Sequence, residues 1–208
     1  MLNIRNIRSD SEEVIEETIT FLSENPSLGV RLRPENTLRE AIDSGFAVEV
    51  RRNGKMVGCS FVYQFDALST VYGEIGTMLV TAEGYGLQSF LACFHMLQLY
   101  TQDFSLANSS VFAVVTPGTK SESNLRDRVS MIEWSPPETL KQLRADTGVP
   151  FKEDKSALHA DLGTLRKAQE SLKSWHEGEN IFRTPKPGEI ISIDIGGFTP
   201  EMLDINLE

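Results

Sequence analysis

Gly84 and Gly86 stand between a stretch of alternating apolar residues and a long stretch with apolar residues at helical spacing. That order predicts a strand, a glycine turn and a helix. The first turn of a helix offers N–H donors without partners at the positive end of the helix dipole, and glycines let a phosphate approach the backbone closely. The turn therefore suits a phosphate-bearing ligand. A plain strand-to-helix turn is the alternative, and the third glycine of the dinucleotide-binding pattern is missing.

The other residue types that carry chemistry form no recognised constellation. Cys93 and His95 are spaced so that they do not face each other on a helix, and no further cysteine or histidine stands near them in the sequence. We therefore expect no metal site. Cys59 and Cys93 are too few for a disulfide framework, so we expect two small buried side chains in a reduced, cytoplasmic setting. The sequence contains no G-x-S-x-G elbow of a serine hydrolase.

Two amphipathic helices are expected before the first strands. One covers residues 9–23, where Ser9 and Glu12 have the spacing of a capping box. The second covers residues 35–43, with Thr37 as its expected cap.

A mixed order of strands and helices follows. Asn53-Gly54, a dipeptide typical of tight hairpin turns, separates two alternating stretches, and residues 111–115 are continuously apolar, as in a strand buried on both faces. Strands are expected over 46–50, 56–63, 71–80, 111–115, 131–134, 157–162 and 189–195. Helices are expected over 87–102, 121–128, 138–146 and 164–175.

This order resembles the fold of the GCN5-related N-acetyltransferases (GNAT), of which the chain would be a divergent member. The resemblance covers about residues 1–135 and is strongest from Glu74 to Met131. It implies an α+β fold class: a central mixed, largely antiparallel, splayed sheet flanked by helices, with a C-terminal extension. We expect a GNAT-like acyl-CoA-binding core at 1–135, a C-terminal part of the same domain at 136–178, and an extension or tail at 179–208.

The resemblance also implies acetyl-CoA as co-substrate and a set of residues that hold it. In the family, the strand before the glycine turn holds the thioester and pantetheine, the turn holds the pyrophosphate, and a polar residue after the buried strand lies beside the pantetheine arm. Helix capping is the alternative role for the serine at that last position. The matching residues are Met78, Leu79, Val80, Gly84, Tyr85, Gly86, Leu87, Ser121 and Asn124.

Glu74 lies on the strand before the glycine turn. In the family, a carboxylate on this strand often deprotonates the acceptor amine, which makes Glu74 the candidate catalytic residue. A solvated carboxylate at the edge of the strand is the alternative. The implied activity is that of an acyl-CoA-dependent N-acyltransferase that moves an acetyl group directly from acetyl-CoA to a primary amine.

Three departures from the family pattern favour a different function. Thr81 stands where the family has Arg or Gln, residues 119–130 contain no tyrosine to protonate the leaving thiolate, and Ser130-Met131 lacks the usual glycine. A catalytically inactive GNAT-fold module that binds CoA or another protein is therefore the alternative. An unrelated α+β domain is the third hypothesis, which is excluded if the strands that begin at Val71 and Val111 lie side by side and splay apart.

The charge and composition of the chain argue against nucleic acids and membranes as its partners. The 208-residue chain has a net charge of −10 and lacks the clustered Lys and Arg that nucleic acids or an anionic membrane surface require. No apolar run approaches the roughly 20 residues of a membrane span. The expected partner is a small-molecule or peptide amine, and the acidic balance suits a cationic one. The sequence leaves three alternative roles for residues 135–208: a lid, an added layer, or a contact between two copies of the chain.

Overall fold

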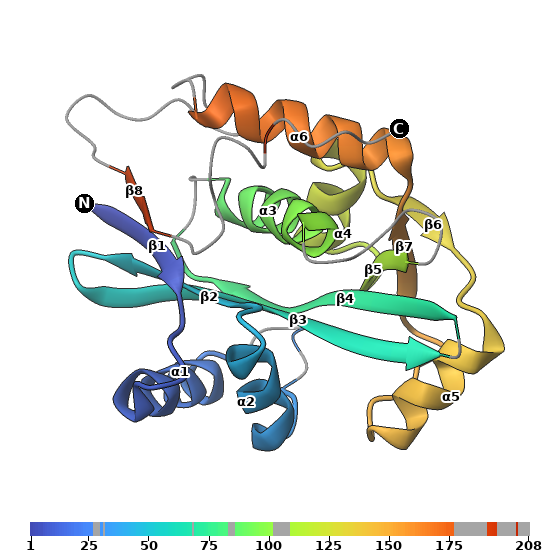
Figure 1. The fold of residues 1–208 in the computed structure, drawn as a ribbon, viewed down its shortest axis with the longest axis horizontal. Helices are drawn as coiled ribbons and strands as arrows, with labels where there is room; N and C mark the ends of the chain where they lie inside the picture. Colours follow the sequence, from blue (N-terminus) through green and yellow to red (C-terminus); the bar gives the residue numbers. More distant parts are fainter. Residues whose placement is uncertain are drawn as a thin grey trace.

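The computed structural model describes residues 1–26, 30, 32–67, 69–82, 86–101, 109–176, 191–194 and 203. Their strands form a mixed sheet with the order β6-β7-β5-β4-β3-β2-β1-β8 (Figure 1). The strands are β1 (Leu2–Asn6), β2 (Ala47–Arg52), β3 (Lys55–Ala67), β4 (Thr70–Val80), β5 (Ser109–Val115), β6 (Ile132–Trp134), β7 (Ser156–Ala160) and β8 (Ile191–Asp194). The helices are α1 (Glu12–Glu24), α2 (Glu35–Asp43), α3 (Leu87–Thr101), α4 (Lys120–Ser123), the π-helix η1 (Asn124–Arg128), α5 (Glu138–Asp146) and α6 (Leu162–His176).

Most neighbouring strands in the sheet are antiparallel. Strands β1 to β4 pair antiparallel in the order β1-β2-β3-β4, and β7 pairs antiparallel with both β5 and β6. The parallel pairs are β4 with β5 and β1 with β8. Asn53 and Gly54 join β2 to β3 with φ angles of +52° and +83°, which confirms the predicted tight hairpin turn.

The start of the chain differs from the sequence prediction in three ways. Strand β1 was not predicted, although its five residues alternate between apolar and polar; the segment pairs antiparallel with β2. The capping box at Ser9 is wrong: the Ser11 N–H donates to the Arg8 carbonyl, so residues 9 and 10 form a turn and α1 begins later. The cap at Thr37 is also wrong, because α2 begins directly after Pro34, whose carbonyl accepts from the Leu38 N–H.

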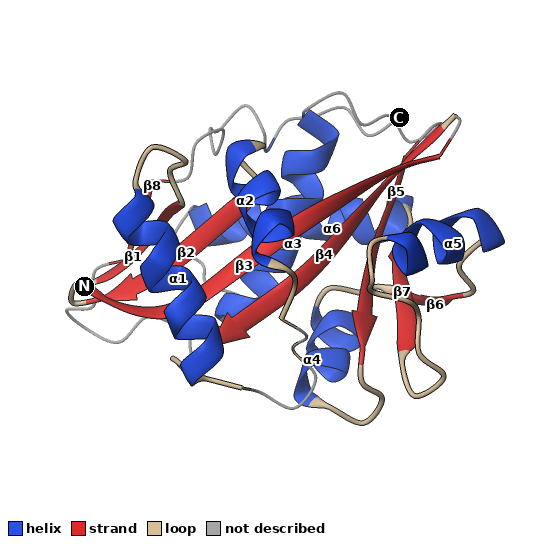
Figure 2. Cartoon of the chain, turned by 90° about the horizontal axis from the view of Figure 1, so that it is seen from below, coloured by secondary structure: helices blue, strands red, loops and turns tan. Residues whose placement is uncertain are grey.

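The helices cover the sheet in two layers. Helices α1, α2 and α5 lie on one face, and α3, α4 and α6 lie on the other (Figures 1 and 2). Each face has its own apolar core, and residues of α3 make up much of the core on the face covered by α3, α4 and α6. Helix α3 packs so closely on β4 that a Cβ added at Gly73 would lie 2.6 Å from the Leu99 Cδ1 atom. A glycine at this position therefore sets the distance between the helix and the sheet.

Helix α3 carries one titratable group in the middle of the core. His95 is fully buried, its Nδ1 lies 3.2 Å from the Gln98 Oε1, and its Nε2 has no hydrogen-bond partner among the described residues. Burial lowers the pKa of His95 to about 4. The histidine is therefore neutral in the folded protein at neutral pH.

This burial predicts a loss of stability in weak acid. The unfolded chain binds a proton at His95 below its ordinary pKa of 6.5, whereas the folded chain does not until the pH approaches 4. We expect the free energy of unfolding to fall by about 2 kcal/mol from this group between roughly pH 7 and pH 5. The measurement is urea denaturation across that range.

His95→Asn is the matched variant, because its amide nitrogen can replace Nδ1 as the donor to Gln98 but does not titrate. Its unfolding free energy should depend less on pH over the same range. Equal pH dependence in the two proteins would contradict the assignment.

Candidate active site

Strands β4 and β5 pair only over their first residues. The pairs run from Val71 with Ser109 to Glu74 with Phe112, yet β4 continues to Val80 and β5 to Val115. The strands that begin near Val71 and Val111 thus lie side by side and then separate, as the sequence predicted. Past Glu74, the facing edges of β4 and β5 form no ladder with each other, so backbone N–H and C=O groups there can bind an inserted ligand.

A β-bulge lies on β4 at this separation. Gly76 is opposite Phe61 and Leu79 is opposite Cys59, so two residues of β4, Thr77 and Met78, face a single residue of β3. Thr77 has a φ of +43°, in the left-handed region. The extra residue shifts which side chains point to each face of the sheet. The bulge therefore turns Thr77 and Met78 toward the gap between β4 and β5, where both line the cavity.

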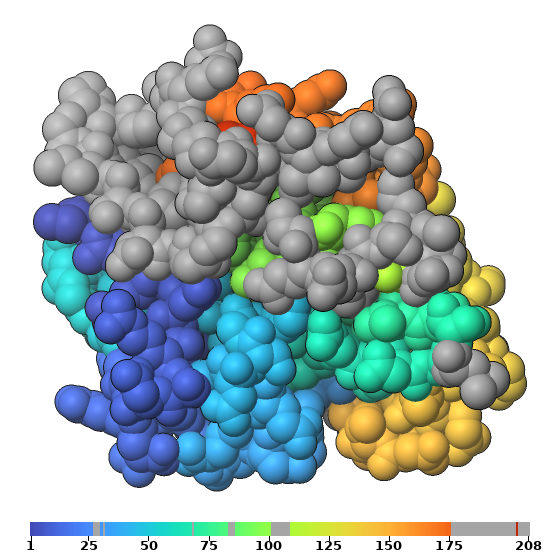
Figure 3. Space-filling view, viewed as in Figure 1, coloured from blue at the N-terminus to red at the C-terminus, as the bar shows by residue number. Residues whose placement is uncertain are grey.

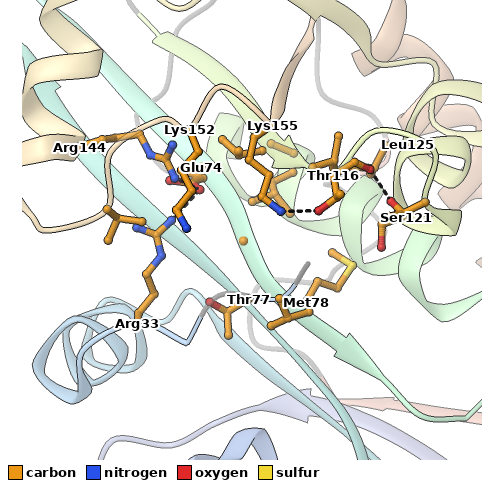
Figure 4. Close-up of a pocket in the computed structure, with 18 of the residues that line it drawn as sticks. Arg33, Glu74, Thr77, Met78, Thr116, Ser121, Leu125, Arg144, Lys152 and Lys155 are labelled. Carbon is orange, nitrogen blue, oxygen red and sulfur yellow. Dashed lines mark hydrogen bonds and ion pairs between the residues drawn. The ribbon is translucent and has the colours of Figure 1, made fainter. Parts of the chain in front are cut away.

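A cavity of about 340 Å³ opens in this gap (Figure 4). Its size falls within the range of small-molecule sites, roughly 300–1,000 Å³. One wall comes from β4 and another from β5 and the start of α4, while α5 and the segment after it cover one end. The lining residues used below are Arg33, Glu74, Thr77, Met78, Gln88, Thr116, Thr119, Ser121, Arg144, Lys152 and Lys155.

Glu74 lies at the point where the strands separate, and two arginines bind it. Arg33 Nη2 donates to Glu74 Oε1 at 2.6 Å, and Arg144 Nη2 donates to the same oxygen at 2.8 Å. All three side chains are at most 4% exposed. Arg33 precedes α2 and Arg144 belongs to α5, so this carboxylate ties two helical regions to the sheet. The second oxygen, Oε2, is buried and accepts no hydrogen bond from any described residue.

Aromatic rings fix the position of both guanidinium groups. The Arg33 Cζ atom lies 4.6 Å from the centre of the Tyr63 ring, and the Arg144 Cζ atom lies 4.2 Å from that of Phe151. The Tyr63 hydroxyl donates to Thr77 Oγ1 at 2.6 Å. Burial raises the pKa of Tyr63, so its hydroxyl stays protonated and can serve as this donor.

Gln88 organises the other end of the cavity. Its Nε2 donates to Ser121 Oγ, and its Oε1 accepts from Asn124 Nδ2, both at 2.7 Å. The first turn of α3 is thereby joined to α4 and η1. Lys155 donates to Thr116 Oγ1 at the same end, as Figure 4 shows.

The structure places the predicted site residues in different settings. Glu74 is buried and ion-paired, so it is not the solvated carboxylate of the alternative interpretation. Met78 and Ser121 line the cavity, and Asn124 reaches it through Gln88. Ser121 does not cap its helix, because Thr119 Oγ1 accepts from the Glu122 N–H.

The remaining predicted residues lie along the path from β4 to α3. The Leu79 side chain packs in the core on the α1 and α2 face, so only its backbone can face a ligand, and Val80 packs against the opposite core. Gly86 has a φ of +66°, which favours glycine, and Leu87 begins α3 with a buried side chain. Gly84 and Tyr85 lie outside the described residues.

Sequence reasoning missed several residues of the site. Arg33 and Arg144 come from segments distant from Glu74 in the chain, and nothing local marks them as its partners. Gln88 carries a signal in the sequence, because it is a polar residue in the first turn of a helix that is otherwise mostly apolar. Among the described residues, no group of three or more His, Cys, Asp or Glu side chains could hold a metal ion. No described helix combines the length and apolar character needed to cross a membrane.

Comparison with known proteins gives one kind of match. No protein-family profile matches the sequence, and no curated protein matches it either. Solved structures do match. N-acetylglutamate synthase from Neisseria gonorrhoeae, complexed with coenzyme A and N-acetyl-glutamate, superposes with a TM-score of 0.54 at 20% identity over 76% of this chain. This chain spans 34% of that protein's length.

Two further structures match over nearly their whole length. Arabidopsis thaliana Naa50, in complex with a bisubstrate analogue of CoA, gives a TM-score of 0.54 at 12% identity over 77% of this chain and 98% of its own. A GNAT-family acetyltransferase from Streptococcus pneumoniae gives 0.53 at 14% identity over 77% of this chain and 99% of its own. The chain therefore has the GNAT fold: a mixed, mostly antiparallel sheet that opens between β4 and β5. The third hypothesis, an α+β domain of a different fold, is excluded.

The buried ion cluster predicts a large effect on stability. In Glu74→Gln, the amide oxygen cannot balance the two buried guanidinium groups, so we expect a loss of about 3–5 kcal/mol in unfolding free energy. The control is Glu133→Gln, because the 72%-exposed Glu133 side chain pairs with Arg126 at the surface and should change stability by no more than about 0.5 kcal/mol. Urea denaturation of both variants measures the difference. Equal, small losses would show that the cluster does not stabilise the fold.

Proposed function

We propose that this protein is an acyl-CoA-dependent N-acyltransferase that moves an acetyl group from acetyl-CoA to a primary amine by direct transfer. The observation that carries the proposal is the separation of β4 from β5 at Glu74, with a bulge and a cavity at that point. An open strand edge beside a cavity supplies aligned backbone donors for an extended arm and for the oxygen of a thioester. Two of the solved structures with a similar fold are complexed with CoA or with a bisubstrate analogue of CoA.

In this proposal the donor substrate follows β4. Backbone groups of Met78, Leu79 and Val80 hold the thioester and the pantetheine arm, with Ser121 and Asn124 on the opposite side of the gap. The start of α3 at Gly86 and Leu87, together with Gly84 and Tyr85, holds the pyrophosphate. Gln88, near the start of α3, holds this end of α3 at a fixed distance from α4 and η1, because its amide bonds to Ser121 and Asn124 at once.

The acceptor approaches from the Glu74 end. Its amine nitrogen forms a bond to the thioester carbonyl carbon, and the negative charge on the carbonyl oxygen is stabilised by a β4 N–H. The Oε2 atom of Glu74, which accepts no hydrogen bond from the described residues, takes the amine proton. The C–S bond then breaks and the CoA thiolate leaves, to be protonated by water, because no tyrosine is among the described residues that line the cavity.

The lack of a tyrosine among the described residues that line the cavity also favours a second candidate function. A GNAT-fold module that binds CoA or another protein without transferring an acyl group needs no acid for the thiolate. The two functions differ in whether acetyl-CoA is consumed when amines are supplied.

CoA binding is the first test. CoA or acetyl-CoA at 100 times its dissociation constant should stabilise the fold by about 2.7 kcal/mol and raise the melting temperature by about 5–10 °C. Gly86→Val should weaken this binding at least tenfold, since the added side chain blocks close approach of a phosphate to the backbone.

Gly45→Val is the control for backbone strain, because Gly45 has a φ of +76° at the end of α2, away from the cavity. It should lose stability but keep the CoA affinity. No thermal shift at millimolar CoA, with cooperative unfolding observed, would refute the proposed function, and equal CoA affinity in the two variants would remove Gly86 from the site.

Turnover tests the role of Glu74. Glu74→Gln should lower kcat by about 100- to 10,000-fold with nearly unchanged CoA affinity, and higher pH should restore part of the rate because more acceptor amine is neutral. Glu49→Gln is the matched control: Glu49 is 1% exposed and bonds to Arg5 and Arg51, but it lies on β2 away from the cavity. It should lose stability and keep kcat. Wild-type turnover in Glu74→Gln would exclude Glu74 as the base.

A further inference from the structure

The charge of the cavity is opposite to that of the chain. The protein has a net charge of −10, yet the described residues that line the cavity include four cationic side chains and one carboxylate. The carboxylate is Glu74, and the cations are Arg33, Arg144, Lys152 and Lys155. The acidic composition suited a cationic acceptor, but the site itself repels one.

The cations are not evenly spread along the cavity. Arg33 and Arg144 both reach Glu74 Oε1, and Lys152 lies on their side of the close-up, while Lys155 bonds to Thr116 at the opposite end (Figure 4). In the space-filling view, the surface is hollowed between α2, which follows Arg33, and α5, which contains Arg144 (Figure 3). The positive end of the cavity thus lies next to an opening of the surface.

A second buried carboxylate shows a different charge balance. Glu49 bonds to Arg5 and Arg51, and Arg51 also bonds to Glu17, so that network contains as many carboxylates as guanidinium groups. At Glu74, two guanidinium groups share one oxygen of one carboxylate. Taking positive charge out of water is costly unless an anion accompanies it. The four cations and one carboxylate among the described residues that line the cavity therefore point to an anionic ligand.

The position along β4 indicates which ligand supplies the anion. Glu74 and Val80 are six residues apart on β4, or about 20 Å at the rise of a strand. The start of α3, which would hold the CoA pyrophosphate, follows Val80. Arg33 and Arg144 therefore lie at the acceptor end of the cavity, remote from the phosphates of the donor.

We propose that the acceptor is a small amine that carries a carboxylate. Arg33 and Arg144 bind the carboxylate, Lys152 adds positive charge at the opening, and the amine points toward Glu74 Oε2. A planar guanidinium suits this task because it can donate two parallel hydrogen bonds to a carboxylate. The proposal rests on the proposed N-acyltransferase function and names the class of its acceptor.

The experiment is an acetyl-transfer assay with paired acceptors. Glycine, β-alanine, aspartate and glutamate are each compared with the analogue in which every carboxylate is a carboxamide. We expect at least one carboxylate-bearing amine to be acetylated with a kcat/KM at least about 100-fold above that of its carboxamide. The same amine should raise the melting temperature of the CoA-bound protein.

Arg33→Gln and Arg144→Gln assign the effect to the site. Each variant should raise KM for the preferred carboxylate acceptor at least tenfold, leave CoA affinity unchanged and reduce discrimination against the carboxamide. Lys141→Gln is the control, since Lys141 lies on α5 with Arg144 but is exposed and paired with Glu138. A purely structural role of the arginines would lower stability without changing the ratio of the paired acceptors.

The outcomes separate the two proposals. No binding of CoA and no consumption of acetyl-CoA would refute the proposed function. Two results would overturn the acceptor class alone. In the first, the protein binds CoA but uses carboxylates and carboxamides equally well. In the second, it binds CoA but neither binds nor acetylates any carboxylate in the panel. A tenfold loss of CoA affinity in Arg33→Gln and Arg144→Gln would also overturn the acceptor class, by assigning the arginines to the phosphates of CoA.

Discussion

Strand β4 leaves β5 after only four residue pairs, and the rest of the site depends on that separation. A sheet that stayed paired to Val80 would fill the gap with its own ladder and leave no edge for a ligand. The bulge at Thr77 and Met78 helps to maintain the opening, since it takes two residues of β4 out of regular register with β3. On the other side, the buried glycine at position 73 brings α3 close to the half of β4 that remains paired.

The ion cluster at Glu74 stabilises the open site by linking β4 to two segments that lie outside the sheet. Arg33 and Arg144 come from segments 111 residues apart, and each stacks on an aromatic ring while bonding to the same carboxylate oxygen. The arrangement makes Glu74 a structural centre, and it is also the one carboxylate among the described residues that line the cavity. These two roles use different oxygens: Oε1 accepts from both arginines, and Oε2, which accepts no hydrogen bond from the described residues, is the atom proposed to take the amine proton.

Local signals in the sequence predicted most of the elements. Asn53-Gly54 fixed the hairpin, and α2 and α5 occur at the predicted residues because their apolar positions keep helical spacing between clear breakers. Strand β1 has the same kind of signal, an alternation of apolar and polar residues from Leu2 to Asn6, but a stretch of five residues does not stand out without its partner β2. The same limit applies to the site. Glu74 was found from its place on the strand, whereas Arg33 and Arg144 reach it only through tertiary packing, which no spacing in the sequence encodes.

The connection between β6 and β7 gives the fold a modular character. This single stretch, residues 135–155, contains α5 and supplies Arg144, Lys152 and Lys155, three of the four cations that line the cavity. The groups proposed for the donor substrate belong to other segments: β4, the residues between β4 and α3, and α3, α4 and η1. Exchange of this one surface segment would therefore be an economical route, for evolution or for an engineer, to a new acceptor preference on an unchanged donor site.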